Sequence, residues 1–260
     1  MPLPSPKPIE LCAIRPVDPD RPDQPVRIVV AGYRARVCEK TCGVLGGDAA
    51  VYGVRWESGS WSDVGQSAGF AATAVRAGMV ALKGGRASRI LGGVQLGTGG
   101  VVAVGAAATA GVAQFRRRLK RAADDGRTLA DVVQRNGWTG RTVHLVGHSL
   151  GTVFIRAALP VLHRAGIQVG DLVLMGGAAG RRGWNELAST FTGRLTNLYS
   201  PRDRVLSVSP IWERVIGTGP IADWPCGRVV NHDLSARLPL WRNPIAHHSG
   251  YWRHLAEFVS

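Results

Sequence analysis

The sequence has few acidic residues, few cysteines and no recognisable nucleotide-binding motif. It contains 18 Asp and Glu against 32 Lys and Arg, which gives a formal net charge of +14. The four cysteines form no C-x-x-C pair and no metal-ligand spacing, so we expect no metal site and reduced thiols. The alternative is a local bridge between Cys38 and Cys42 in an oxidising compartment. Neither a G-x-x-x-x-G-K-[ST] loop nor a G-x-G-x-x-G turn after the first strand occurs, so no cofactor is expected.

The positive charge has two interpretations. No zinc finger or RNP signature accompanies it, so the sequence predicts no nucleic-acid partner. An excess of basic residues either forms a solvated arginine-rich surface or favours an anionic partner such as a membrane surface. Both alternatives stay open on composition alone.

The first 25 residues have no apolar core of a signal peptide and hold eight of the fifteen prolines. Proline lacks the backbone donor that a helix or a central strand needs, so we expect a proline-rich extended arm over residues 1–25. Without a leader the expected location is cytoplasmic, with peripheral membrane contact as an alternative. The remaining residues 26–260 have the length of a single domain.

Short apolar runs alternate with helical stretches along residues 26–260. The predicted strands are 26–31, 50–56, 141–147, 171–175, 194–199 and 228–234. The predicted helices include 129–136, 150–164 and 251–259. The first of these follows a capping-box spacing that begins at Thr128. Such alternation predicts an α/β fold with a mostly parallel central sheet and helices on both faces.

The strand at 141–147 runs into Gly147-His148-Ser149-Leu150-Gly151, and helix-forming residues follow. This strand–turn–helix context is typical of a nucleophile elbow, in which a serine lies at the apex of a sharp turn. The turn leaves no room for a Cβ two residues before or after the serine, which explains the two glycines. We therefore predict that Ser149 is a nucleophile. The alternative is an ordinary tight turn with an unreactive serine.

A serine hydroxyl is a weak nucleophile at neutral pH, so it needs a base and a carboxylate that orients the base. With this elbow, the acid and then the histidine follow the serine in the chain. Asp203 lies four residues past the strand at 194–199, and His248 lies in the loop expected after the last strand. We predict that they are the acid and the base. The rival residues are Asp223, Asp233 and His247.

A tetrahedral intermediate needs two hydrogen-bond donors for its oxygen. We expect the backbone N–H groups of Leu150, which follows the serine, and of Tyr33, in the loop after the first strand. A donor of this kind typically contributes about 3–4 kcal/mol to catalysis. The predicted reaction is acyl transfer: Ser149 attacks a carbonyl, His248 accepts and returns the proton, and water releases the acid.

Residues 90–115 form an Ala/Gly-rich segment with no charged side chain over 26 positions. The segment is long enough to span a bilayer but only mildly hydrophobic. Basic residues follow it directly, at Arg116, Arg117, Arg118, Lys120 and Arg121. Three interpretations stay open for residues 90–121: a buried or lid helix pair, an interfacial contact with anionic lipid, or a true span.

Four stretches together resemble an uncharacterised α/β-hydrolase family that includes eukaryotic transmembrane and coiled-coil domain proteins. They are residues 147–151, 193–206, 230–235 and 248–252, which contain the motifs Tyr199-Ser200-x-x-Asp203 and His248-Ser249-x-Tyr251. The resemblance covers residues 26–258 and implies an α/β-hydrolase fold with Asp203 as acid and His248 as base. The chain has His247 and Gly250 where the family pattern Gly-His-Ser-Asp-Tyr has glycine and aspartate.

These features predict a serine hydrolase of the esterase or lipase type, which acts on a small-molecule or lipid-like carboxylic ester. The Ala/Gly-rich insertion would line or cover its acyl pocket. The alternative is a non-catalytic module on the same fold, in which the uncharged segment and its basic flank bind a membrane or a partner. Convergence of Ser149, Asp203 and His248 separates the two hypotheses.

Overall fold

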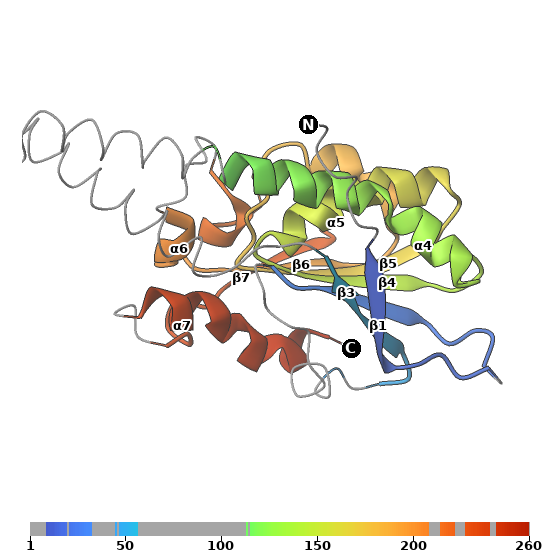
Figure 1. Ribbon diagram of the computed structural model, residues 1–260. Coiled ribbons are helices and arrows are strands. Elements are labelled where there is room, and N and C mark those ends of the chain that lie inside the picture. The colour runs from blue at the N-terminus through green and yellow to red at the C-terminus, as the bar shows by residue number, and fades with distance from the viewer. Residues whose placement is uncertain are drawn as a thin grey trace, which may run out of the picture.

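The central element is a mixed β-sheet with helices on both of its faces (Figure 1). The computed structural model describes residues 9–19, 21–32, 45, 47–56, 113, 115–207, 214–221, 227–239 and 243–259. Within them the sheet has seven strands in the order β1-β3-β2-β4-β5-β6-β7. The strands are β1 (Glu10–Arg15), β2 (Val26–Val30), β3 (Ala50–Arg55), β4 (Val143–His148), β5 (Val169–Met175), β6 (Leu195–Tyr199) and β7 (Val229–Asp233). In this part of the chain only β1 is antiparallel to its neighbour.

Six of these strands confirm the prediction from apolar runs. β2, β4 and β5 are almost wholly buried, as expected for parallel strands covered on both faces. The sequence did not predict β1, which lies within the expected extended arm and pairs with β3 from Glu10 opposite Arg55 to Arg15 opposite Val51. β1 is an edge strand with exposed and half-buried side chains, so no apolar run marks it.

Two cores lie on the two faces of the sheet. The helices are α4 (Leu129–Arg135), α5 (Gly151–Arg164), η2 (Asn185–Thr190), α6 (Arg204–Ser207), η3 (Ile216–Thr218), α7 (Pro244–Ser249) and η4 (Gly250–Phe258). On one face, Leu145 of β4 belongs to a core with α4 and α5. On the other face, Val146 belongs to a core with Tyr251 and Leu255 of η4. The predicted helices at both faces are therefore present, which makes this an α/β protein.

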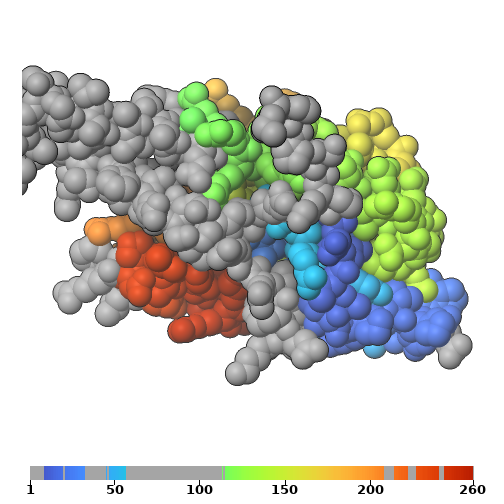
Figure 2. All heavy atoms as spheres, viewed as in Figure 1, coloured from blue at the N-terminus to red at the C-terminus, as the bar shows by residue number. Residues whose placement is uncertain are grey.

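Residues 115–127 are also helical and lie against α5. Gly126 approaches this helix so closely that a Cβ would overlap the Phe154 carbonyl oxygen. In the space-filling view, these residues (green) and the C-terminal helices (red) lie on opposite sides of the molecule (Figure 2). The helical residues 115–127 therefore belong to the same layer as α4 and α5.

The predicted capping box at Thr128 is wrong. The Thr128 side chain makes no capping hydrogen bond, and its hydroxyl instead donates to the Asp125 carbonyl at 2.8 Å. The reason is that helical residues 115–127 lead almost directly into α4, so Thr128 does not stand at a free helix start. Its own backbone angles are in the helical region, where an N-cap residue usually is not.

The prediction that His248 lies in a loop is also wrong, because this residue lies on the short helix α7. Asn243 caps the helix by accepting a hydrogen bond from the Ala246 N–H at 3.0 Å, and Pro244 is its first residue. The amphipathic helix expected at 251–259 is present as the 3-10 helix η4.

Most of the predicted insertion cannot be compared with the fold: residues 90–112 and 114 lie outside the described residues. In the part of the chain that the structure does describe, no helix combines the length and the apolar character needed to cross a membrane.

Candidate active site

The strand order reverses between β2 and β4, and open α/β sheets bind their ligands at such a point. From β2 the chain continues to β3 on one side, whereas β4 pairs with β2 on the other side. Gly32 follows β2 and Ser149 follows β4, and the two residues meet: a Cβ on Gly32 would lie 2.5 Å from Ser149 Cβ. The predicted nucleophile therefore lies at the switch point of the sheet.

Ser149 occupies a strained turn between β4 and α5. Its φ of 56° is the only positive value for a non-glycine among the described residues, a conformation that costs roughly 1–3 kcal/mol. The Ser149 N–H donates to the Met175 carbonyl at 3.0 Å, and the Ser149 carbonyl accepts from the Thr152 hydroxyl at 2.8 Å. Gly151 lies so close to β2 that a Cβ would overlap the Val30 carbonyl oxygen. The strand–turn–helix geometry that the sequence predicted is present.

Asp203 and His248 form a buried pair. The His248 Nδ1–H donates to Asp203 Oδ2 at 2.7 Å, and neither side chain is exposed to solvent. The other carboxylate oxygen accepts from the backbone N–H groups of Val205 at 3.1 Å and Leu206 at 3.3 Å. Because the carboxylate holds the proton on Nδ1, the neutral ring has its lone pair on Nε2, the nitrogen that a general base uses.

His247, the neighbouring candidate, has a different set of contacts. Its Nδ1 lies 2.9 Å from the Pro239 carbonyl, which can only accept, so Nδ1 carries the proton. Its Nε2 then accepts from the Ser200 hydroxyl at 3.1 Å. Both ring nitrogens of His247 are therefore used, and the histidine that meets Asp203 is His248. Because Ser200 begins the loop of Asp203, this contact also ties that loop to α7.

His148 connects the elbow to the histidine helix. It directly precedes Ser149, and its Nε2–H donates to the His248 carbonyl at 2.8 Å. The centroids of the two imidazole rings lie 4.9 Å apart. Ser149 Oγ and the His248 ring, both of them described, make no hydrogen bond with each other. The structure thus brings the predicted acid and base together beside the elbow, without a direct serine–histidine hydrogen bond.

His148 should make the stability of the protein depend on pH. Burial, reinforced by the adjacent His248, lowers the pKa of His148 to about 3. The unfolded chain binds this proton near pH 6.5 whereas the folded chain stays neutral, so the free energy of unfolding falls as the pH drops below about 6.5. Between pH 7 and pH 5 the loss from His148 alone is about 2 kcal/mol.

Urea unfolding at these two pH values measures the loss. His148→Gln removes the titrating ring and keeps an N–H donor, so its unfolding free energy should change by about 2 kcal/mol less than that of the wild type. His163→Gln alters an exposed histidine near the end of α5 and should retain the wild-type change. Equal changes in the wild type and in His148→Gln would contradict the assignment.

One of the two predicted oxyanion donors can be placed. Leu150 immediately precedes α5, and its backbone N–H donates to no acceptor among the described residues, as is usual for the first amides of a helix. The partial positive charge of the helix N-terminus also favours a developing negative charge there. Tyr33, the second predicted donor, lies outside the described residues, one position beyond Gly32.

The other candidate acids and bases that the structure describes have their contacts outside this site. Asp233 is exposed and accepts from the Ser235 N–H at 2.8 Å, and Asp223 lies outside the described residues. The His144 ring, on β4, accepts from the Asp171 N–H at 3.0 Å. Across the described ranges, no group of three or more His, Cys, Asp and Glu could hold a metal ion.

Asp203 has a further partner that was not predicted from the sequence. The Tyr251 hydroxyl donates to Asp203 Oδ2 at 3.5 Å. Burial raises the pKa of Tyr251 well above its usual value, which keeps the hydroxyl protonated and able to donate. Tyr251 lies three positions after His248, so a helical assignment there would have placed both residues on one face. The contact between Ser200 and His247 had no such local signal.

The protein is of the α/β class. Its mostly parallel sheet carries a strained serine turn at the switch point, and a buried Asp–His pair lies beside that turn. The chain belongs to the family described as "Protein of unknown function (DUF726)", whose model matches residues 48–239. It is 27% identical over 151 residues to an uncharacterized membrane protein of Caenorhabditis elegans, a match that covers 55% of this chain and 23% of that protein. The chain thus spans less than a quarter of that relative. No solved structure matches it.

Proposed function

We propose that the chain has an α/β-hydrolase fold and is a serine hydrolase of the esterase or lipase type. The observation that carries the proposal is the 2.7 Å hydrogen bond between His248 Nδ1 and Asp203 Oδ2, buried beside the positive-φ turn of Ser149. Burying a carboxylate and an imidazole is costly unless they are paired, and such pairs are frequent at functional sites. A structural ion pair would not require a strained serine next to it.

In the proposed reaction His248 Nε2 takes the hydroxyl proton of Ser149 while Oγ attacks the ester carbonyl carbon. The N–H groups of Leu150 and Tyr33 receive the oxyanion of the tetrahedral intermediate. His248 returns the proton to the leaving alcohol, and an acyl-enzyme forms on Ser149. Water then gives a proton to His248 and attacks the acyl carbon. As the bond to Ser149 Oγ breaks and the carboxylic acid leaves, His248 returns that proton to Oγ. Asp203 keeps Nδ1 protonated and stabilises the imidazolium in both steps.

The proposal requires Ser149 and His248 to come together when substrate binds. Catalytic hydrogen bonds are often long or poorly aligned without a ligand and tighten only in the complex. His248 is fixed twice, through its carbonyl to His148 and through Nδ1 to Asp203. Rotation of the small Ser149 side chain is therefore the simplest movement that would form the contact.

The surroundings of the elbow support an apolar acyl group. A small buried cluster lies at the start of α5, and partly buried Phe115 and Leu119 pack against it. Its members are Leu150, Ala178, Leu206 and Val215. Arg116 and Arg117, on the same helix as Phe115, are exposed. We therefore propose a small-molecule or lipid-like carboxylic ester as substrate. An anionic membrane surface contacted by a peripheral, cytoplasmic protein is the proposed place for a lipid ester.

A non-catalytic module on the same fold is the second candidate. The observation that favours it is the missing hydrogen bond between Ser149 and the His248 ring. In that case the buried pair would serve stability, and the basic residues after the uncharged segment would bind a membrane or a protein partner.

Labelling with a fluorophosphonate probe distinguishes the two candidates. Folded wild-type protein should be labelled covalently, and Ser149→Ala should not be labelled at all, because the phosphorus bonds to the activated oxygen. Ser189→Ala, which removes an exposed serine on η2, should label like the wild type. Folded wild-type protein that resists the probe would favour the non-catalytic module.

A further inference from the structure

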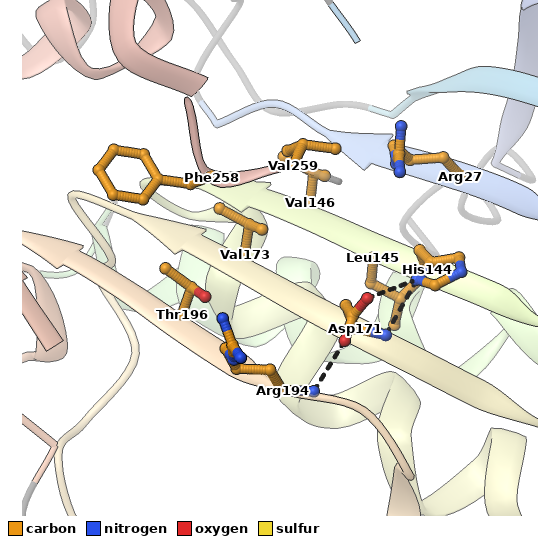
Figure 3. Close-up of a pocket in the computed structure, with 10 residues that line it drawn as sticks. All are labelled: Arg27, His144, Leu145, Val146, Asp171, Val173, Arg194, Thr196, Phe258 and Val259. Carbon is orange, nitrogen blue, oxygen red and sulfur yellow. Dashed lines mark hydrogen bonds and ion pairs between the residues drawn. The ribbon is translucent and has the colours of Figure 1, made fainter. Parts of the chain in front are cut away.

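A cavity separate from the active site lies on the sheet face that η4 covers (Figure 3). Its volume is about 320 Å³, at the lower end of the roughly 300–1,000 Å³ of small-molecule sites. Residues on or next to β2, β4, β5 and β6 line it, together with Phe258 and Val259. His144 in its wall lies five positions before Ser149, which places this wall roughly 16 Å from the elbow along the chain.

Two polar side chains in the cavity are not used by the protein. The Arg194 guanidinium makes no hydrogen bond or ion pair with any residue the structure describes; only its backbone N–H does, to Asp171 Oδ1 at 2.8 Å. The Thr196 hydroxyl also has no hydrogen-bond partner in the described ranges, although Thr196 is only 6% exposed. Figure 3 shows both side chains on one wall, with their polar ends close together. Neither polar group is engaged by a described residue, so both are available to a ligand in the cavity.

The described residues that line the cavity include two guanidinium groups and one carboxylate. Besides Arg194 they are Arg27, a buried residue of β2 opposite His144 in the strand register, and Asp171. The His144 ring is neutral, because its Nδ1 accepts from the Asp171 N–H at 3.0 Å and burial lowers its pKa. The Arg194 guanidinium, which meets no described partner, therefore favours a ligand with a negative charge.

The rest of the wall is apolar. Val146 and Val173 are buried residues of the adjacent strands β4 and β5, and the Phe258 ring borders the cavity from η4. An inorganic anion would leave this apolar surface without a partner. A neutral hydrocarbon would shield the Thr196 hydroxyl from water without a hydrogen bond and would leave the nearby Arg194 charge without a partner. A ligand with both an anionic end and a hydrocarbon portion satisfies both parts of the wall.

We propose that this cavity binds an amphipathic anion. Its carboxylate or phosphate meets Arg194 and Thr196, and its hydrocarbon portion lies against Val146, Val173 and Phe258. Binding here does not involve Ser149, so the site is independent of the proposed hydrolase activity.

Isothermal titration calorimetry with octanoate, octyl phosphate, octanol and inorganic phosphate tests this site. At least one of the two charged amphiphiles should bind, and the tighter one identifies the head group. Octanol and inorganic phosphate should each bind at least about tenfold more weakly, since each satisfies only half of the wall. Ser149→Ala should bind like the wild type, whatever the outcome of fluorophosphonate labelling.

Two variants locate the binding. Arg194→Gln changes an exposed side chain and should weaken the tighter amphiphile about tenfold or more, because it removes a charge-assisted hydrogen bond. Thr196→Val removes the hydroxyl at similar size and should weaken it about fivefold. Arg164→Gln, at the exposed end of α5, should leave the affinity unchanged. The proposal is overturned if neither amphiphile binds, if octanol binds as tightly, or if both folded cavity variants keep wild-type affinity.

Discussion

Replacing Asp203 by Asn should slow the fluorophosphonate labelling of Ser149 about 10³- to 10⁴-fold. The Asp203 carboxylate accepts a hydrogen bond from the His248 Nδ1–H at 2.7 Å, and both side chains are fully buried. An amide can turn an N–H toward Nδ1, which must then accept, so the ring proton moves to Nε2. The ring can no longer take the proton of Ser149, and a tautomer change of this kind costs about 10⁴ in rate in serine triads.

Asn is the informative substitution because it can preserve the local structure. Its carbonyl oxygen can still accept from the Val205 and Leu206 N–H groups, so the start of α6 keeps its hydrogen bonds. Asp233→Asn is the matched control, since this carboxylate is exposed and bonds the Ser235 N–H. It should label at the wild-type rate. If folded Asp203→Asn labelled within about tenfold of the wild type, Asp203 would not be the orienting acid.

Topology made the meeting of Asp203 with a histidine predictable from the sequence. Parallel strands bring their carboxyl ends to one edge of the sheet, so the loops after β4, β6 and β7 open toward the same crevice. Asp203 and a histidine after β7 follow from this rule. The choice between His247 and His248 depends on tertiary contacts, because neighbouring residues share the same topology and differ only in what their side chains meet. The bond from Ser200 to His247 is such a contact.

The features that the sequence did not reveal have physical reasons. β1 is an edge strand that is stabilised by hydrogen bonds to β3 rather than by burial, so its side chains need no apolar pattern. α7 has six residues, too few for apolar periodicity to be recognised. Its signal was the pair Asn243-Pro244, an N-cap followed by proline at the first helical position.

Gly151→Ala should lower the free energy of unfolding by about 3 kcal/mol and should also suppress labelling of Ser149. A Cβ at residue 151 would overlap the carbonyl oxygen of Val30, a backbone atom of β2 that cannot rotate away as a side chain can. Relief requires α5 to move away from the sheet, and strain of this kind typically costs about 1–3 kcal/mol, occasionally more. Urea unfolding measures the stability, and the fluorophosphonate probe measures the elbow.

Gly140→Ala is the matched control, because a Cβ there meets no atom within 4 Å. This substitution should leave labelling unchanged and shift the free energy of unfolding by less than about 1 kcal/mol. Unchanged stability in Gly151→Ala would mean that α5 is not pressed against β2. If Gly151→Ala were destabilised but still labelled fully, the position of Ser149 would not depend on this contact. We expect Gly151→Ala to lose stability and labelling together. The two residues that follow Ser149 fix both the position of α5 against the sheet and the position of the Ser149 hydroxyl at the switch point.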